Sequence, residues 1–150
     1  MYSMNQLVKV LKSLLKMFLG QCPLLILPYM RQFHPNAAVT TETDIVIEGF
    51  PRSANSFSVR SLRISHQSPV KIAHHLHIPA QLIFGVKRGI PTLLLLRNPL
   101  EAVTSLCIYE PRISPTVGLL GYILFYSPLK PYKEKMVIAD FDTVTLINLQ

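Results

Sequence analysis

Apolar residues follow two patterns along the chain: helical spacing in some segments and short unbroken runs in others. Between residues 7 and 19 they recur at helical spacing with lysines on the opposite side, which predicts an amphipathic helix. Unbroken apolar runs at residues 45–47, 92–96 and 136–139 predict buried strands, and residues 70–73 are a further candidate. Because these runs do not alternate with polar residues, we expect both faces of the sheet to be covered.

Helices are predicted between the strands. One carries Phe57 and Val59, and a second begins at Pro79 and runs to about Arg88, with Gly89 placed to end it in a left-handed conformation. A third follows the strand at residues 92–96 and runs to about residue 109, and a fourth covers about residues 117–125. This alternation of strands and helices predicts an α/β fold with a parallel β-sheet flanked by helices.

The length of 150 residues fits a single domain. We divide it into an N-terminal amphipathic helix and loop over residues 1–43 and an α/β core over residues 44–150. Parallel sheets of this kind bind ligands at the carboxyl ends of their strands. The segments that directly follow the strands are therefore where we expect a functional site.

The net charge of +7 favours an anionic partner. No Lys/Arg-rich run, zinc-finger spacing or aromatic RNA-binding signature accompanies the charge, so we expect no nucleic-acid partner. Cys22 and Cys107 lie far apart and outside any metal-binding spacing, which predicts no disulfide framework, no metal and a cytoplasmic location. The apolar stretch at residues 23–28 is too short, and too interrupted by proline, for a membrane span.

A first strand-to-helix corner has the sequence Gly-Phe-Pro-Arg-Ser-Ala-Asn-Ser-Phe, residues 49–57. Backbone N–H groups at a helix N-terminus bind phosphate or sulfate, and small residues let the anion approach. Arg52 adds a positive charge, and the side chains of Ser53, Asn55 and Ser56 can donate hydrogen bonds. The Gly-Lys-Ser/Thr ending of a Walker A loop is missing, which disfavours kinase or NTPase chemistry.

A second corner follows the strand at residues 92–96. Arg97 ends the strand, Asn98 is a predicted helix cap with Pro99 at the first helical position, and Glu101 is expected to reach back to the cap. Ser105 stands eight residues after Arg97. Two cationic corners on one sheet imply a ligand with two anionic ends.

The first corner resembles the sulfotransferase loop around the 5′-phosphosulfate of 3′-phosphoadenosine 5′-phosphosulfate (PAPS), Pro-Lys/Arg-Ser-Gly-Thr/Asn-Thr/Ser followed by an aromatic residue. Arg97 and Ser105 resemble the family's 3′-phosphate motif, an Arg at a strand end and a Ser eight residues on. The resemblance runs from about Ile45 to Phe141. It implies a P-loop-like three-layer sulfotransferase fold, PAPS as sulfuryl donor, an unidentified hydroxyl or amine acceptor, and no metal.

The resemblance also implies roles for the matched residues. Those expected to bind the cofactor are Arg52, Ser53, Ala54, Asn55, Ser56, Phe57, Arg97 and Ser105. Arg52 is in addition expected to stabilise the charge that develops on the leaving nucleotide during catalysis. Arg52 replaces the commoner Lys, and Ala54 replaces the usual Gly, which is tolerated only where the backbone stays open to an L-residue.

Between the two corners, Ala-His-His-Leu-His-Ile-Pro at residues 73–79 resembles the family's histidine segment. His77, shortly before the proline, is the predicted general base, and His75 is the second candidate because a one-step shift in alignment exchanges them. His74, His75 and His77 are too close together for a full metal site and have no neighbouring carboxylate or cysteine. Partly exposed histidines at a strand end, without a catalytic role, are the other interpretation.

Family members usually continue further and add an Arg-Lys-Gly loop over the nucleotide. Lys87-Arg88-Gly89 precedes the second corner, so we interpret it as a helix end, and only nine residues follow Phe141. We therefore expect a fold that is incomplete at its C-terminus. Two alternatives stay open: an inactive remnant that at most binds the nucleotide, and a basic membrane-surface protein that uses the helix at residues 7–19. If that helix does not bind a membrane, we expect its apolar face to pack against the rest of the domain.

Overall fold

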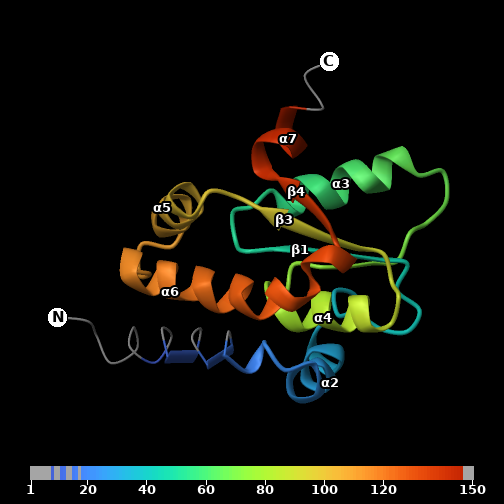
Figure 1. Cartoon of the computed structure of the whole chain (residues 1–150), viewed down its shortest axis with the longest axis horizontal. Coiled ribbons are helices and arrows are strands. Elements are labelled where there is room, and N and C mark those ends of the chain that lie inside the picture. Colours follow the sequence, from blue (N-terminus) through green and yellow to red (C-terminus); the bar gives the residue numbers. More distant parts are fainter. Residues whose placement is uncertain (1–7, 9–10, 13–14, 17, 147–150) are drawn as a thin grey trace.

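A four-stranded parallel sheet forms the centre of the molecule (Figure 1). The computed structural model describes residues 8, 11–12, 15–16 and 18–146. The strands are β1 (Ile45–Gly49), β2 (Ile72–His74), β3 (Thr92–Leu96) and β4 (Val137–Asp140), in the spatial order β2-β1-β3-β4. Val46 pairs with Thr92 across β1 and β3, and Leu93 pairs with Val137 across β3 and β4. The predicted α/β class with a parallel sheet flanked by helices is confirmed.

Helices connect the strands. They are α2 (Pro23–Phe33), α3 (Asn55–Ser65), α4 (Pro79–Lys87), α5 (Pro99–Tyr109), α6 (Pro115–Tyr126), the 3₁₀ segment η1 (Ser127–Lys135) and the short α7 (Phe141–Leu146). The four helices predicted between and after the strands are present as α3 to α6. The helical segments α2, η1 and α7 were not among the predicted elements.

The helix α2 forms despite an interior proline, Pro28. Pro23 at the first turn is compatible with a helix, but Pro28 removes one backbone hydrogen bond, and proline inside a helix is ordinarily destabilising. Burial of Ile26, Leu27 and Met30 against the domain offsets this cost. Tertiary packing, which local sequence signals do not report, therefore decides the conformation of this segment.

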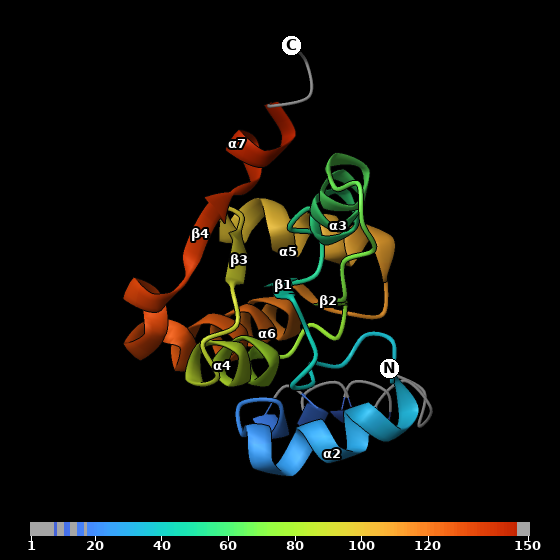
Figure 2. The same cartoon turned by 90° about the vertical axis from the view of Figure 1, so that its right-hand side faces the viewer.

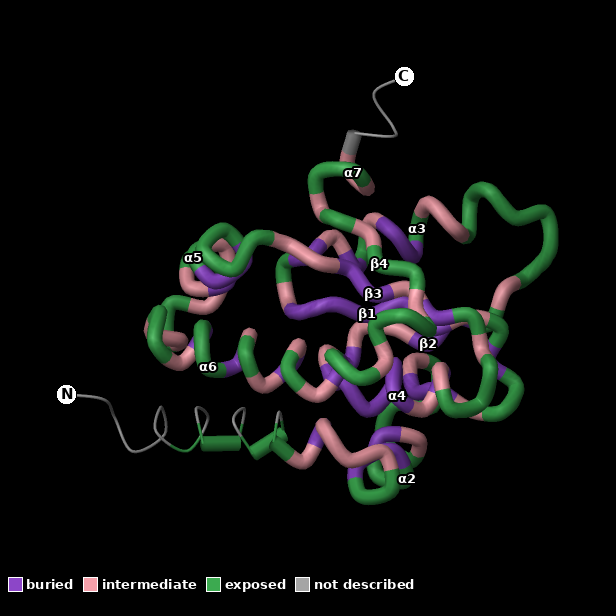
Figure 3. The backbone as a smooth tube through the Cα atoms, viewed as in Figure 1, coloured by how far each residue is buried: buried purple, intermediate pink, exposed green. Residues whose placement is uncertain are grey.

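Helices cover both faces of the sheet (Figures 1 and 2), and each face has its own core. On one face, Val46 and Leu94 pack with buried residues of α2, α4, α5 and α6. On the other, Ile47 and Leu95 pack with Val59 of α3. The central strands β1 and β3 are mostly buried, as predicted, whereas β4 is largely exposed (Figure 3), so the prediction of a buried strand at residues 136–139 is wrong in its burial.

The helix ends follow the predicted local chemistry in most respects. Gly89 has φ 68° after the last turn of α4, so residues 87–89 are a helix end as predicted. The Asn98 side chain accepts a hydrogen bond from the backbone N–H of Leu100 at 2.9 Å, which confirms the predicted cap of α5. Glu101 was expected to reach back to the cap residue. Its carboxylate instead accepts a hydrogen bond from Nε of Arg97 at 3.4 Å, so this expectation is wrong.

The segment before α2 is helical at its described positions, which include Leu11, Lys12 and Leu15. Leu7, Lys9, Val10 and Leu14 of the predicted amphipathic helix lie outside the described residues. The apolar side chains that are described point largely to solvent; these are Val8, Leu11, Leu15 and Phe18. The expectation that this apolar stripe packs against the domain is therefore wrong for these four residues. Within the described part of the chain, no helix is long and apolar enough to cross a membrane.

The sheet order places a topological switch point between β1 and β3. From β1 the chain runs outward to β2 and then returns to the other side of β1 to form β3. The loops that leave the carboxyl ends of β1 and β3 therefore diverge to opposite faces and open a crevice, where ligands bind in such sheets. The two cationic corners are these loops, and Figure 1 shows the loop after β1 near the start of α5.

Candidate functional site

The loop after β1 is a tight turn held by its own polar groups. The carbonyl of Phe50 accepts hydrogen bonds from the backbone N–H of Ser53 at 3.2 Å and from Nδ2 of Asn55 at 3.1 Å. Nδ2 of Asn55 also approaches the carbonyl of Gly49 at 3.5 Å. The sequence had suggested that the side chain of Asn55 donates hydrogen bonds to a bound anion. Asn55 is instead buried, and its amide holds the loop in shape.

The N-terminus of α3 presents unpaired backbone donors. Among the described residues, no partner accepts a hydrogen bond from the N–H groups of Ala54, Asn55, Ser56 and Phe57. Ala54 occupies the cap position but has no side-chain oxygen with which to satisfy them. Beside them, the hydroxyl oxygen of Ser53 and Oδ1 of Asn55 are buried and have no partner in the described part of the chain. An anion at this helix end would supply acceptors for the N–H groups and for the Ser53 hydroxyl, whereas Oδ1 of Asn55 requires a donor.

The second corner brings Arg97 and Ser105 to the same place as Arg52. Nε of Arg52 donates to the hydroxyl of Ser105 at 3.1 Å, and Nη1 of Arg97 donates to the carbonyl of Arg52 at 2.8 Å. These three residues line an open hollow of about 680 Å³ on the outer face of α5. The two corners, 45 residues apart in sequence at Arg52 and Arg97, thus share one cationic hollow.

Arg97 is held firmly at the base of the hollow. Its guanidinium carbon lies 3.9 Å from the centre of the Phe141 ring, and Nε faces the carboxylate of Glu101 at 3.4 Å. Its carbonyl accepts a bond from the hydroxyl of Tyr122 at 2.7 Å. An arginine fixed by stacking and hydrogen bonds is pre-organised to bind an anion, although Glu101 would compete with that anion for the same guanidinium.

Arg52 departs from the expected geometry. It was expected to bind the phosphosulfate at the helix start, but its side chain extends to α5, where it lies over the ring of Tyr109 at 5.0 Å. The backbone of Arg52 is also unusual, with a φ of 71° in the left-handed region. In this conformation Arg52 stands beside the residues matched to the 3′-phosphate motif.

Tyr126 joins the two strand ends. Its hydroxyl donates to the carbonyl of Leu95 at 2.7 Å and accepts a bond from the backbone N–H of Phe50 at 3.3 Å. Burial raises the pKa of this phenol, so it stays neutral and retains both bonds. Sequence analysis did not single out Tyr126, although Tyr122 and Tyr126 stand four residues apart on an otherwise apolar helix.

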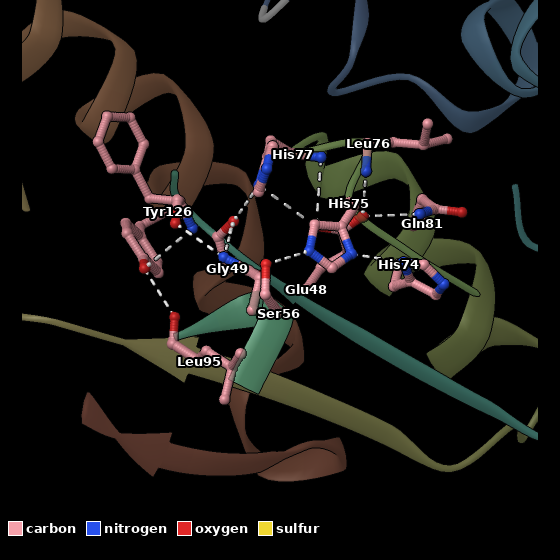
Figure 4. A network of polar contacts seen from close by, with 12 residues as sticks. Glu48, Gly49, Ser56, His74, His75, Leu76, His77, Gln81, Leu95 and Tyr126 are labelled. Atoms are coloured by element: carbon pink, nitrogen blue, oxygen red, sulfur yellow. Dashed lines mark hydrogen bonds and ion pairs between the residues drawn. The ribbon is translucent and has the colours of Figure 1, made fainter. Parts of the chain in front are cut away.

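The histidine segment lies against the first corner (Figure 4). Nε2 of His75 is 2.9 Å from the hydroxyl of Ser56, and Nδ1 of His77 is 2.9 Å from the carbonyl of Gly49. Since a carbonyl can only accept, Nδ1 of His77 carries the proton and Nε2 is the basic nitrogen. His74 faces Nδ1 of His75 and Arg63, away from this contact. Both candidate bases therefore reach the loop after β1.

Glu48, which sequence analysis missed, positions this segment. Its carboxylate is fully buried and accepts bonds from the backbone N–H groups of Leu76 at 2.7 Å and His77 at 3.2 Å, and from Nε2 of Gln81 at 2.8 Å. Burial raises the pKa of Glu48 to about 7 despite these bonds. A lone carboxylate in the apolar run Ile-Val-Ile-Glu-Gly was the signal available in the sequence.

Burial also lowers the pKa values of the three histidines in this segment. It is the largest cause of a lowered pKa at both His75 and His77, and it lowers the pKa of His74 to about 4. At His77 the bond to Gly49 opposes the shift, and the positive charge of Lys16 adds to it. His77 is thereby biased toward the neutral form that a general base requires.

Within the part of the chain that the structure describes, left-handed backbone at non-glycine residues occurs in the loop after β1 and in the histidine segment. Among the described residues, the non-glycine positions with positive φ are Arg52, Ala54, His75 and His77. Such conformations cost free energy and concentrate at functional sites. Ala54, the position where the resembling family has Gly, has φ 64°, so here an L-residue occupies the left-handed region that Gly favours.

Comparisons with protein-family models, curated proteins and solved structures found no match to this chain. The site therefore has to be interpreted from its own geometry.

Proposed function

We propose that this chain is a PAPS-dependent sulfotransferase that transfers a sulfuryl group to a hydroxyl or amine acceptor. The observation that carries the proposal is the meeting of Arg52, Arg97 and Ser105 in one hollow, together with the N–H groups of residues 54–57, which follow Arg52 and have no acceptor among the described residues. Such a site offers separate positions for two anionic groups at a topological switch point. PAPS carries two such groups, a 5′-phosphosulfate and a 3′-phosphate.

In the proposed arrangement the N–H groups of residues 54–57 hold the 5′-phosphosulfate, and Arg97 with Ser105 holds the 3′-phosphate. Arg52 extends toward Ser105 here, so its stabilising role requires its side chain to turn back toward α3. Arg52 is exposed, and among the described residues such a rotation breaks its bond to Ser105 and its contact with the Tyr109 ring.

His77 acts as the general base. The acceptor oxygen or nitrogen attacks sulfur, the bond between sulfur and the bridging phosphate oxygen breaks, and the nucleotide leaves as the 3′,5′-bisphosphate. The acceptor proton passes to Nε2 of His77, whose Nδ1 is occupied by Gly49. Glu48 fixes the backbone of His77 and acts as a positioning residue.

Titration with 3′-phosphoadenosine 5′-phosphate by calorimetry tests the nucleotide site, with 5′-AMP as the ligand control. We expect the bisphosphate to bind and AMP to bind much more weakly. Arg97→Ala should weaken binding of the bisphosphate by about tenfold to a hundredfold, and Ser105→Ala by less, because each removes a hydrogen bond to the 3′-phosphate.

Arg88→Ala is the matched control, since Arg88 carries the same charge at the end of α4 and contacts Phe84. Absence of binding by the folded wild type, or an equal loss in Arg88→Ala, contradicts the proposal. Binding of the bisphosphate without turnover of PAPS against a broad acceptor panel would instead support the inactive nucleotide-binding remnant.

A further inference from the structure

The N-terminal part of the molecule exposes a large apolar surface, which we call the N-terminal apolar face. Its members are Val8, Leu11, Leu15 and Phe18 of the segment before α2, and Leu24, Leu25, Tyr29 and Phe33 of α2. Leu11, Phe18 and Leu25 are each 65% exposed, although their side chains are fully apolar. Clusters of this kind on a soluble surface mark an interaction site.

The exposed residues form stripes along both segments. Leu25, Tyr29 and Phe33 follow one another at intervals of four residues on α2, and the rings of Tyr29 and Phe33 lie 4.6 Å apart. The opposite side of α2 carries the buried residues Ile26, Leu27 and Met30. Figures 1 and 2 show that both segments lie at the same end of the molecule, away from α7.

The part of the sequence that carries this face has charges of one sign, although Arg31 itself contacts the Val39 carbonyl and the Phe84 ring. The first 41 residues of the chain contain four Lys or Arg and no Asp or Glu. Lys12, between Leu11 and Leu15, is exposed beside the stripe. Apolar side chains flanked by basic residues are the arrangement with which helices insert into the headgroup region of anionic membranes.

We propose that the N-terminal apolar face binds the surface of an anionic lipid bilayer, with both segments lying in the plane of the interface. A second copy of the chain fits the face less well, because pairing two such surfaces brings like charges together without an acidic partner. The binding does not depend on the proposed enzymatic function.

The face is joined to the candidate site by a short, well-packed turn. The carbonyl of Gly20 accepts a hydrogen bond from the N–H of Ala80 at 2.7 Å. A side chain at Gly20 would meet Ile78 at 2.9 Å, so the turn rests directly on the residue after His77. A bilayer bound at this face would therefore be held at a fixed position relative to the histidine segment.

Flotation of the full chain with vesicles tests the proposal. We expect binding to vesicles that contain phosphatidylserine, and weaker binding to pure phosphatidylcholine. Leu11→Glu, Phe18→Glu and Leu25→Glu should each reduce the partition coefficient by about tenfold or more, because each removes an inserted apolar group and adds a negative charge. Flotation suits this chain because it contains no Trp for a fluorescence assay.

Ile64→Glu is the matched control, since Ile64 is 77% exposed on α3 and the substitution changes the charge equally. It should reduce binding less than twofold, and circular dichroism should show that all four variants stay folded. The proposal is overturned if the wild type does not float with anionic vesicles, or if Ile64→Glu loses as much binding as the others. It is also overturned if the wild type is a stable dimer that Leu11→Glu dissociates, because a second copy would then cover the face.

Discussion

The backbone of Ala54 is strained at the point where an anion would be bound. With φ 64°, it holds an L-residue in the left-handed region and so directs the next N–H groups of α3 toward the crevice. Arg52, His75 and His77 share this feature. At the scale of single residues, the site is therefore built from conformations that cost stability.

Ala54→Gly should stabilise the protein. Gly removes the steric cost of the left-handed region, about 1 kcal/mol, and this exceeds the entropy that Gly adds to the unfolded chain, so we expect the free energy of unfolding to rise by about 0.5 kcal/mol. Urea unfolding measures it.

The reverse substitution, Gly89→Ala, provides the matched control. Gly89 has φ 68°, and no atom lies within 4 Å of where its Cβ would be, so only the backbone is affected. Gly89→Ala should lower the free energy of unfolding by about 1 kcal/mol. A loss of stability in Ala54→Gly would show that Ala54 is not strained.

The lowered pKa of His77 predicts how activity depends on pH. A general base must be neutral, so kcat/KM falls when His77 becomes protonated. Because the pKa of His77 lies below the ordinary histidine value of 6.5, we expect this acid limb below pH 6.5 and constant kcat/KM above it. His77→Ala should abolish this limb and lower kcat/KM by about a hundredfold or more.

His75→Ala distinguishes the two candidate bases. It removes the contact with Ser56 but leaves Nε2 of His77 in place, so we expect the limb to persist with a smaller loss of kcat/KM. If His75→Ala removes the limb and His77→Ala does not, the base is His75. NMR titration of the two imidazoles checks the pKa values independently of any acceptor.

At the scale of elements, Glu48 ties β1 to the histidine segment and to α4. Through Gln81 the network continues to the backbone N–H of Val39, which Oε1 of Gln81 binds at 2.6 Å. Residues 76–81 thus bind the buried carboxylate of β1 directly, and Val39 joins the same network through Gln81.

Glu48→Gln should change how stability depends on pH. Because the pKa of Glu48 is about 7 in the folded chain and 4.5 ordinarily, the folded state binds more protons between these values, and the wild type loses stability as pH rises through this window. Glu48→Gln has no carboxyl group to ionise at this position. Its free energy of unfolding should therefore rise, relative to that of the wild type, by on the order of 2 kcal/mol as the pH is raised from 4.5 to 8.

Both proteins contain the histidines, so their contributions cancel from this difference apart from the charge of Glu48, which raises the pKa of His75 in the wild type alone. Their lowered pKa values act in the opposite direction, since stability from a neutral histidine is lost as pH falls below 6.5. Urea unfolding at the two pH values measures the effect, with the exposed Glu134→Gln as control. A difference that does not change with pH would contradict the raised pKa.

The elements were predictable where local signals and packing agree. The apolar run at residues 92–96 became β3, and Asn98 caps α5 as its sequence implied. The helix α2 was not predicted, and it forms because burial of one of its sides outweighs the local cost of Pro28. The direction of Arg52 and the burial of Glu48 depend on backbone angles and distant neighbours that no local pattern encodes.

For the whole molecule, the parallel sheet followed from the alternation of elements. What could not be predicted was that Arg52 and Arg97 meet in one hollow, because their separation depends on how the two loops pack. The exposure of Leu11 and Phe18 could likewise not be predicted. The spacing of apolar residues shows that a helix has an apolar face, but not whether another part of the protein packs against that face.

The exposure of β4 affects how the protein will behave at high concentration. It is the outer strand of the described sheet, with Val137 67% exposed and Ile138 46% exposed. An apolar strand with one free edge is a template on which further strands can assemble into aggregates. Lys133 and Lys135, just before β4, supply like charges that oppose such stacking. Colloidal stability should therefore fall as added salt screens these lysines, so dilute, low-salt buffers suit this protein.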